Sequence, residues 1–289
     1  ADAWAEPLLT GWRAVARQLG ARNIGPGGRE RIREGWRQLG SPKIIAVFSP
    51  VGGVGKTTTA VHLGHALALV RGDLVVALDA NPDSGNLVKR ISEPHSALGA
   101  GELHREAESL LRCTDLLPYV TTADSGLWVV RSGPDTGARL GADEYRHIPQ
   151  VVSRYSSVIV VDLGTSMREP GLLAVAEAAD ALVAVAAPEG ESAEAAIDAI
   201  DWVNQRFADR NRVSTVVINA VRARSRGLDC GELSAGSELY VDQVLQVPHD
   251  PRLATGGACP WALLSRRTRD AYLQAAATLV TLIHEQEHS

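Results

Sequence analysis

The sequence predicts an α/β fold in which a mostly parallel, twisted β-sheet is covered by helices on both faces. From residue 43 onward, short runs rich in valine, isoleucine and alanine alternate with stretches of helical pattern. A glycine-rich loop, residues 49–59, joins the first apolar run to the first helical stretch, which is typical of phosphate-binding proteins. Because α/β proteins of 289 residues often fold as one unit, we expect one main domain over residues 43–289.

The first 42 residues are expected to form a helical extension. Apolar residues recur there at spacings of three and four, and a Gly-Pro-Gly-Gly break at 25–28 separates a first helix from a short second one near residues 32–39. Seven arginines against four acidic residues give this segment +3, so the rest of the chain carries −8 within the total of −5. The two helices either pack on the main domain or dock to a partner protein; a membrane-surface role is the third alternative, although the segment is not densely basic.

The glycine-rich loop suits the phosphates of a nucleotide. Its glycines let backbone N–H groups turn toward phosphate oxygens, and the following helix presents its positive end to the same anion. Lys56 can reach the outer phosphates, and the Thr57 hydroxyl can ligate Mg²⁺. The alternative is a glycine turn that merely joins strand to helix. The predicted cofactor-binding residues of the loop are Gly52, Gly53, Val54, Gly55, Lys56, Thr57 and Thr58.

The run Gly-Gly-Val-Gly-Lys-Thr-Thr at 52–58 resembles the deviant Walker A loop of the MinD/ParA family, ATPases that dimerise face to face over two sandwiched ATP molecules. The resemblance implies a P-loop NTPase fold with ATP and Mg²⁺ as cofactors. In that family a signature lysine precedes the glycine pair and reaches the partner's nucleotide, whereas this chain has Val51. Because valine cannot offset phosphate charge, the resemblance implies that ATP binding is kept while hydrolysis is slow or absent.

Seven apolar runs are the expected strands of the sheet. Ligands of parallel sheets collect at the carboxyl ends of the strands, so the residues that follow these runs are the candidates for a site. The expected strands cover residues 44–48, 74–78, 127–130, 158–161, 181–186, 215–218 and 241–247.

Polar residues follow the second expected strand. By resemblance, Asp79 helps to organise Mg²⁺ and the loop lysine, while Asn81 stands where the family has an aspartate that orients the attacking water. An amide can hydrogen-bond that water but cannot accept its proton. Asp83 either substitutes for the missing carboxylate or is a solvated turn residue. The predicted catalytic residues are Lys56, Asp79, Asn81 and Asp83.

Asp162 ends the fourth expected strand, which resembles a Walker B strand. Burying an acid there is costly without a counter-charge, and a water-mediated Mg²⁺ would supply one. The alternative is that Asp162 caps the following helix. The predicted metal ligands are Thr57, Asp79 and Asp162.

The later strands are expected to hold the base of the nucleotide. By resemblance, the amide of Asn219 contacts the adenine ring, although an asparagine there could also simply form a turn. Residues 247–254 match the loop that closes over the base in relatives, so Pro248 and Asp250 are predicted cofactor-binding residues. His249 is expected to be structural, because no nucleophile or base partner lies near it in sequence.

Further segments, including residues 79–83 and 248–257, resemble an actinobacterial branch of the family, the EspI-like proteins associated with type VII (ESX) secretion. This resemblance implies a nucleotide-gated regulator or assembly factor with a protein partner in a secretion apparatus and a nucleotide-dependent homodimer. No run approaches the roughly twenty apolar residues of a membrane span, and no signal peptide opens the chain. We therefore expect a cytoplasmic protein without an integral membrane segment.

The alternative function is a ParA-type DNA-partitioning ATPase that acts as an ATP-dependent dimer on DNA. Two arginine clusters, within residues 222–226 and 266–269, either form a DNA-binding patch or are ordinary solvated surface. The net charge of −5 argues against nucleic acid as a partner. The three cysteines are widely spaced and lack a Cys-x-x-Cys pair, so neither a disulfide framework nor a zinc–cysteine site is predicted.

Overall fold

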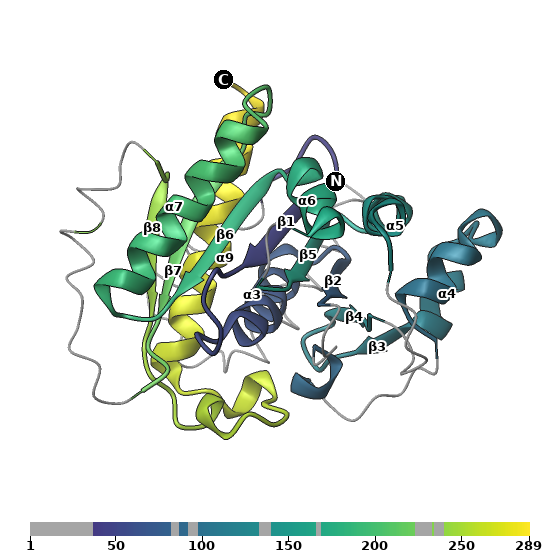
Figure 1. Ribbon diagram of the computed structural model, residues 1–289. Coiled ribbons are helices and arrows are strands. Elements are labelled where there is room, and N and C mark those ends of the chain that lie inside the picture. Colours follow the sequence, from purple (N-terminus) through teal and green to yellow (C-terminus); the bar gives the residue numbers. More distant parts are fainter. Residues whose placement is uncertain are drawn as a thin grey trace, which may run out of the picture.

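The computed structural model describes residues 37–81, 87–91, 98–132, 140–165, 169–222, 233 and 240–289. Within these ranges, one eight-stranded sheet has the order β3-β4-β2-β5-β1-β6-β7-β8 (Figure 1). Every neighbouring pair of strands is parallel except β3 and β4, so the predicted, mostly parallel sheet is confirmed. The strands are β1 (Lys43–Phe48), β2 (Val75–Ala80), β3 (Val120–Thr122), β4 (Trp128–Val130), β5 (Val158–Leu163), β6 (Ala181–Ala186), β7 (Val213–Asn219) and β8 (Gln243–Val247).

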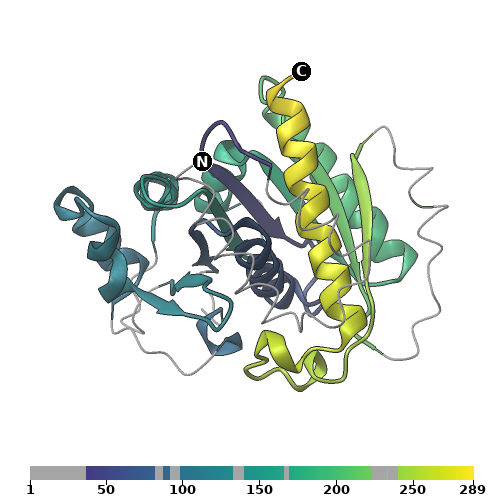
Figure 2. The same ribbon diagram turned by 180° about the vertical axis from the view of Figure 1, so that it is seen from behind.

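Helices cover both faces of this sheet, as predicted. α3 and α9 lie together on one face, α5, α6 and α7 lie on the other, and α4 packs against α5 near the β3–β4 edge (Figures 1 and 2). Successive residues of a buried strand face opposite sides, so Ile45 and Val47 join the core beneath α3 while Ala46 and Phe48 join the other core. The helices are α3 (Lys56–Arg71), α4 (Ala100–Arg105), α5 (Ala142–Ser153), α6 (Pro170–Ala178), α7 (Gly190–Arg206) and α9 (Arg266–Glu287).

Among the strands of the described residues, the sequence missed β3. All seven predicted runs overlap strands of the sheet, but β3 has only three residues and pairs antiparallel with β4 across a tight turn. Gly126 in that turn has φ of 87°, and its N–H donates to the Ala123 carbonyl at 2.9 Å. Three residues are too few to show an alternating pattern, so only pairing with β4 identifies this strand.

Only residues 37–42 of the predicted helical extension are described, and residues 37–39 are not helical; the first predicted helix lies outside the described residues. The Gly40 N–H donates to both carboxylate oxygens of Glu287, at 3.1 and 3.0 Å, and this contact holds the segment at the end of α9. No helix within the described ranges combines the length and the apolar character that crossing a membrane requires.

Candidate nucleotide-binding site

The glycine-rich loop lies between the end of β1 and the start of α3. Gly53 and Gly55 have φ of 78° and 87°, in the left-handed region that residues with a Cβ rarely adopt. Gly55 also has no room for a side chain, because a Cβ there would lie 2.2 Å from Asn219 Nδ2. The loop conformation and its packing against the end of β7 therefore both require glycine at position 55.

Lys56, the first residue of α3, forms a buried ion pair with Asp162 on β5. Lys56 Nζ lies 2.5 Å from Asp162 Oδ1, and both side chains are almost fully buried. A buried charge needs a partner, and these two side chains supply each other with one. The helix-cap alternative for Asp162 does not hold, because the N-cap of α6 is Glu169.

Asp79 ends β2 beside Asp162, since the two residues are paired in the β2–β5 register. Burial, reinforced by the charge of Asp162, raises the pKa of Asp79 to about 7. Burial also raises the pKa of Asp162, and Lys56 opposes that shift. Asp79 accepts hydrogen bonds from the N–H groups of Asn81 and Leu87, at 3.1 and 3.0 Å. Two adjacent buried carboxylates repel each other, so an added cation would stabilise the pair.

A cavity of about 520 Å³ opens at the loop. This volume lies within the range of roughly 300–1,000 Å³ that small-ligand sites occupy. The cavity is bounded by the loop and by the segments that follow β2, β5, β7 and β8, at the carboxyl edge of the sheet. The predicted site residues that line it are Gly53, Gly55, Lys56, Thr57, Thr58, Asn81, Asn219, Pro248 and Asp250.

Some predicted site residues do not line the cavity. Gly52 and Val54 belong to the loop but are not among the residues that line the cavity. Asp79 and Asp162 are buried, and Asp162 contacts the cavity-lining Lys56. Asp83 lies outside the described residues. Val51 lines the cavity with 38% of its surface exposed, so the residue before the glycine pair places an apolar side chain at the site.

Two residues predicted to contact the base have hydrogen bonds within the protein. Asn219 Nδ2 donates to the Val54 carbonyl at 2.9 Å, which ties the end of β7 to the loop. The Asp250 carboxylate accepts from the N–H groups of Arg252 and Ser265, at 3.0 and 2.8 Å. Burial would raise the pKa of Asp250, but these hydrogen bonds outweigh it and hold the pKa below its usual value. Both residues line the cavity, and their contact with a base stays a prediction.

Arg90 also lines the cavity, although the sequence did not indicate it. Arg90 ends a short 3₁₀ helix, η1 (Val88–Arg90), and its carbonyl accepts from the Cys259 N–H at 2.9 Å. The positive charge of Arg90 lowers the pKa of the Asp162 carboxyl, although it does so less than Lys56 does, and burial acts in the opposite direction. No local pattern could have identified Arg90, because it reaches the cavity only through the packing of the neighbouring Leu87, Val88 and Ile91 into the core that includes α3.

Residues 45–254 match the family described as the CobQ/CobB/MinD/ParA nucleotide binding domain, from β1 through the loop after β8. The chain belongs to this family. The MinD/ParA resemblance carried by the glycine-rich loop is thereby confirmed.

Relatives of this family member include the ESX-1 secretion-associated protein EspI of Mycobacterium tuberculosis, which is 29% identical over 240 residues. The match covers 81% of the chain but 36% of EspI, so the chain spans about a third of the length of this relative. A putative replication protein A of Rhizobium rhizogenes is 38% identical over 81 residues, covering 27% of the chain and 19% of that protein.

Solved structures of the family share the fold. A ParA family ATPase from Chlorobium tepidum superposes with a TM-score of 0.66 at 17% identity, covering 82% of this chain and 98% of that one. MinD in the MinC:MinD complex of Aquifex aeolicus gives a TM-score of 0.61 at 20% identity, covering 82% and 95%.

The residues beside the loop fit a Mg²⁺ ion. Asp162 Oδ2 is buried without a hydrogen-bond partner, and Asp79 lies next to it in the sheet. With the Thr57 hydroxyl, these groups form an all-oxygen donor set, which suits Mg²⁺ better than softer metals. Thr57 would hold the ion, with Asp79 and Asp162 around it, and the ion would neutralise phosphate charge.

Proposed function

We propose that this chain binds Mg·ATP and Mg·ADP in the cavity at the glycine-rich loop. The observation that carries the proposal is the cavity of about 520 Å³ lined by loop glycines and Lys56, with the buried Asp162 carboxylate paired to Lys56 and Asp79 beside it in the sheet. Two structural neighbours support it by their bound ligands: MinD of Pyrococcus horikoshii is complexed with Mg-ADP, and a putative partition protein of Borrelia burgdorferi is bound to AMPPNP.

The nucleotide would act through the Lys56–Asp162 ion pair. Phosphate oxygens would draw Lys56 Nζ away from Asp162, and the released carboxylate would turn to Mg²⁺. Asp79 holds the segment after β2 through its hydrogen bonds to Asn81 and Leu87, so a change at the carboxylates would reach that segment. This exchange is the basis of the proposed nucleotide gating.

Hydrolysis should be slow or absent. Val51 offers no cation at the mouth of the cavity, and Asn81 lines the cavity with an amide in place of a carboxylate. Both changes remove groups that would act on the transition state, while the groups that would bind the phosphates are retained.

The biological role that we propose is a nucleotide-gated regulator or assembly factor of a type VII (ESX) secretion system, acting from the cytoplasm on a protein partner. The support is the similarity to EspI over 81% of the chain. A nucleotide-dependent homodimer is part of this proposal, and its partner-facing surface would change as the nucleotide changes.

The test is a titration of the chain with Mg·ATP and Mg·ADP, with phosphate release and light-scattering mass measured on the same samples. We expect binding without appreciable release, loss of binding in Lys56→Ala, and gain of release in Val51→Lys. If the Lys56→Ala variant binds ATP as tightly as the wild type, the assignment of the cavity as the nucleotide site is wrong. Rapid release by the wild type would overturn the inference from Val51.

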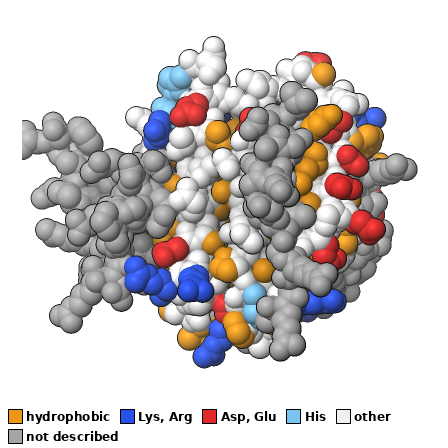
Figure 3. Space-filling view, turned by 90° about the vertical axis from the view of Figure 1, so that its left-hand side faces the viewer, with side chains coloured by type: hydrophobic (Ala, Val, Ile, Leu, Met, Phe, Trp, Pro, Cys, Tyr) orange, Lys and Arg blue, Asp and Glu red, His pale blue; other side chains and the backbone are white. Residues whose placement is uncertain are grey.

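A DNA-partitioning ATPase is the second candidate. One relative, a putative replication protein A, has a name that indicates a role with DNA, and it matches 81 residues of the chain. Arg266 and Arg267 are exposed at the start of α9, whereas Arg224 and Arg226 lie outside the described residues. On the face shown in Figure 3, the described Lys and Arg side chains form small separate groups beside acidic ones. This candidate requires DNA binding that depends on ATP and falls steeply with salt; absence of such binding rejects it.

A further inference from the structure

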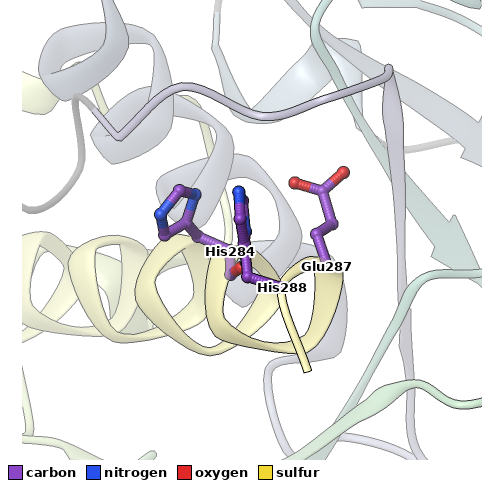
Figure 4. Close-up of side chains that lie close together, drawn as sticks. All are labelled: His284, Glu287 and His288. Atoms are coloured by element: carbon purple, nitrogen blue, oxygen red, sulfur yellow. The ribbon is translucent and has the colours of Figure 1, made fainter.

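The last turn of α9 carries two histidines and a glutamate on one side of the helix (Figure 4). His284, Glu287 and His288 are spaced i, i+3 and i+4, which places them on the same face. One potential ligand atom from each residue lies within 4.8 Å of the other two. The ring centroids of the two histidines are 4.3 Å apart. This group lies at the opposite end of α9 from the segment that borders the nucleotide cavity.

Backbone carbonyls orient both imidazoles. His284 Nδ1 lies 3.0 Å from the Gln38 carbonyl, and His288 Nδ1 lies 2.7 Å from the His284 carbonyl. A carbonyl only accepts, so each Nδ1 carries the proton and each neutral ring keeps a lone pair on Nε2. Histidines that ligate metals are usually prepared in this way, with the second ring nitrogen donating to a carbonyl or carboxylate.

Glu287 supplies an ionised oxygen beside these rings. Lys43 Nζ lies 2.7 Å from Glu287 Oε1, and the Gly40 N–H donates to both carboxylate oxygens at 3.1 and 3.0 Å. A carboxylate has about four lone-pair positions, and Lys43 and Gly40 occupy three of them. Lys43 Nζ also lies 3.7 Å from Asp180, so its charge is balanced by a second carboxylate.

A purely structural role explains part of this arrangement. The Glu287 contacts with Lys43 and Gly40 anchor the segment before β1 without any metal. Capping of the helix end accounts for each histidine–carbonyl hydrogen bond taken singly, but it does not require two imidazoles and a carboxylate to offer ligand atoms within 4.8 Å of one another. The negative end of the α9 macrodipole lies at the same turn and favours a cation there.

We propose that His284, Glu287 and His288 form a binding site for a divalent transition-metal ion of the Zn²⁺ type. The ligands would be one ring nitrogen of each histidine and one oxygen of Glu287, with water completing the shell. Imidazole nitrogens with a carboxylate suit Zn²⁺, whereas Mg²⁺ prefers oxygen alone. Zinc ligands lie about 2.0–2.2 Å from the ion, so the three ligand atoms, which lie within 4.8 Å of one another, would draw closer by side-chain rotation.

The ion would also fasten the segment that leads into β1. Gln38 and Gly40 contact His284 and Glu287, and therefore a metal that fixes those side chains would fix residues 38–40 as well.

The test is calorimetric titration of the whole chain with Zn²⁺ alone, with Mg²⁺ in parallel. A second histidine pair, His104 and His147, has Nδ1 atoms 3.2 Å apart and could also take Zn²⁺, so His147→Gln is the matched control. We expect one Zn²⁺ site that His288→Gln weakens by at least about tenfold and that His147→Gln leaves unchanged. His288 is exposed, so His288→Gln should melt like the wild type.

Hydrogen exchange provides an independent readout. Zn²⁺ should slow exchange of the Gly40 amide in the wild type and in His147→Gln, but not in His288→Gln. The proposal is overturned if Zn²⁺ does not bind, if His288→Gln binds it as tightly as the wild type, or if only His147→Gln loses binding. Protection of Gly40 that survives in His288→Gln would equally overturn it.

Discussion

Acid should destabilise this domain through His65, which is buried on α3. Only 1% of its surface is exposed, its Nδ1 lies 2.7 Å from the Ser125 hydroxyl, and its ring stacks on His62 at 5.5 Å. Burial lowers the pKa of His65 to about 4, because a buried imidazolium would lose its hydration. A histidine in the unfolded chain titrates near pH 6.5. As pH falls, the unfolded state therefore takes up the proton first, so the stability present above about pH 6.5 is lost down to about pH 4.

Linkage gives the size of this effect. Between pH 7 and pH 5, His65 alone should lower the free energy of unfolding by about 2 kcal/mol, and by pH 4 the loss should approach about 3 kcal/mol. His62 acts in the same direction, because burial and the neighbouring His65 also lower its pKa well below the usual value. Both histidines pack beside Trp261, so protonation should destabilise the packing of α3 against the segment that contains Trp261.

Urea unfolding of the wild type and of His65→Gln at pH 7 and pH 5 measures the effect. Glutamine keeps a polar group for Ser125 but gains no proton, so the wild type should lose about 2 kcal/mol more than this variant between the two pH values. His104→Gln, which replaces a half-buried histidine on α4, is the control and should follow the wild type. Equal losses in the wild type and in His65→Gln would refute the reasoning.

Four other outcomes can be checked with single variants. Gly55→Ala should abolish ATP binding in a titration, because its Cβ would meet Asn219 Nδ2 at 2.2 Å and φ is 87°. Asn219→Ala should lower the free energy of unfolding in urea by about 1 kcal/mol, since the Val54 carbonyl loses its donor. Arg90→Ala should weaken ATP binding by about tenfold, the scale of one charge-assisted hydrogen bond, with an unchanged melting temperature. Asn81→Asp added to Val51→Lys should raise phosphate release by at least about tenfold over Val51→Lys alone, because a carboxylate can accept the proton of the water.

Local and contiguous features were determined by the sequence alone. The loop at 52–58 brings its glycines, Lys56 and Thr57 together within a few residues, so backbone geometry alone directs them at one anion. The alternation of buried strands with helices also determined the class of fold. The spacing of apolar residues in each segment follows from the local geometry of a strand or a helix and can therefore be read from the sequence. β3 could not be predicted in this way, since three residues hold no period.

Contacts between distant residues were decided only by the tertiary structure. Lys56 pairs with Asp162 across 106 positions, Asn219 reaches Val54 across 165, and Gly40 meets Glu287 across 247. Such partners depend on strand order and register, which the packing of the whole sheet sets and no local pattern encodes. The sequence could therefore name a lysine and two aspartates for the site. The β2–β5 register placed the carboxylates of Asp79 and Asp162 side by side. Packing of α3 against β5 brought Lys56 into an ion pair with Asp162.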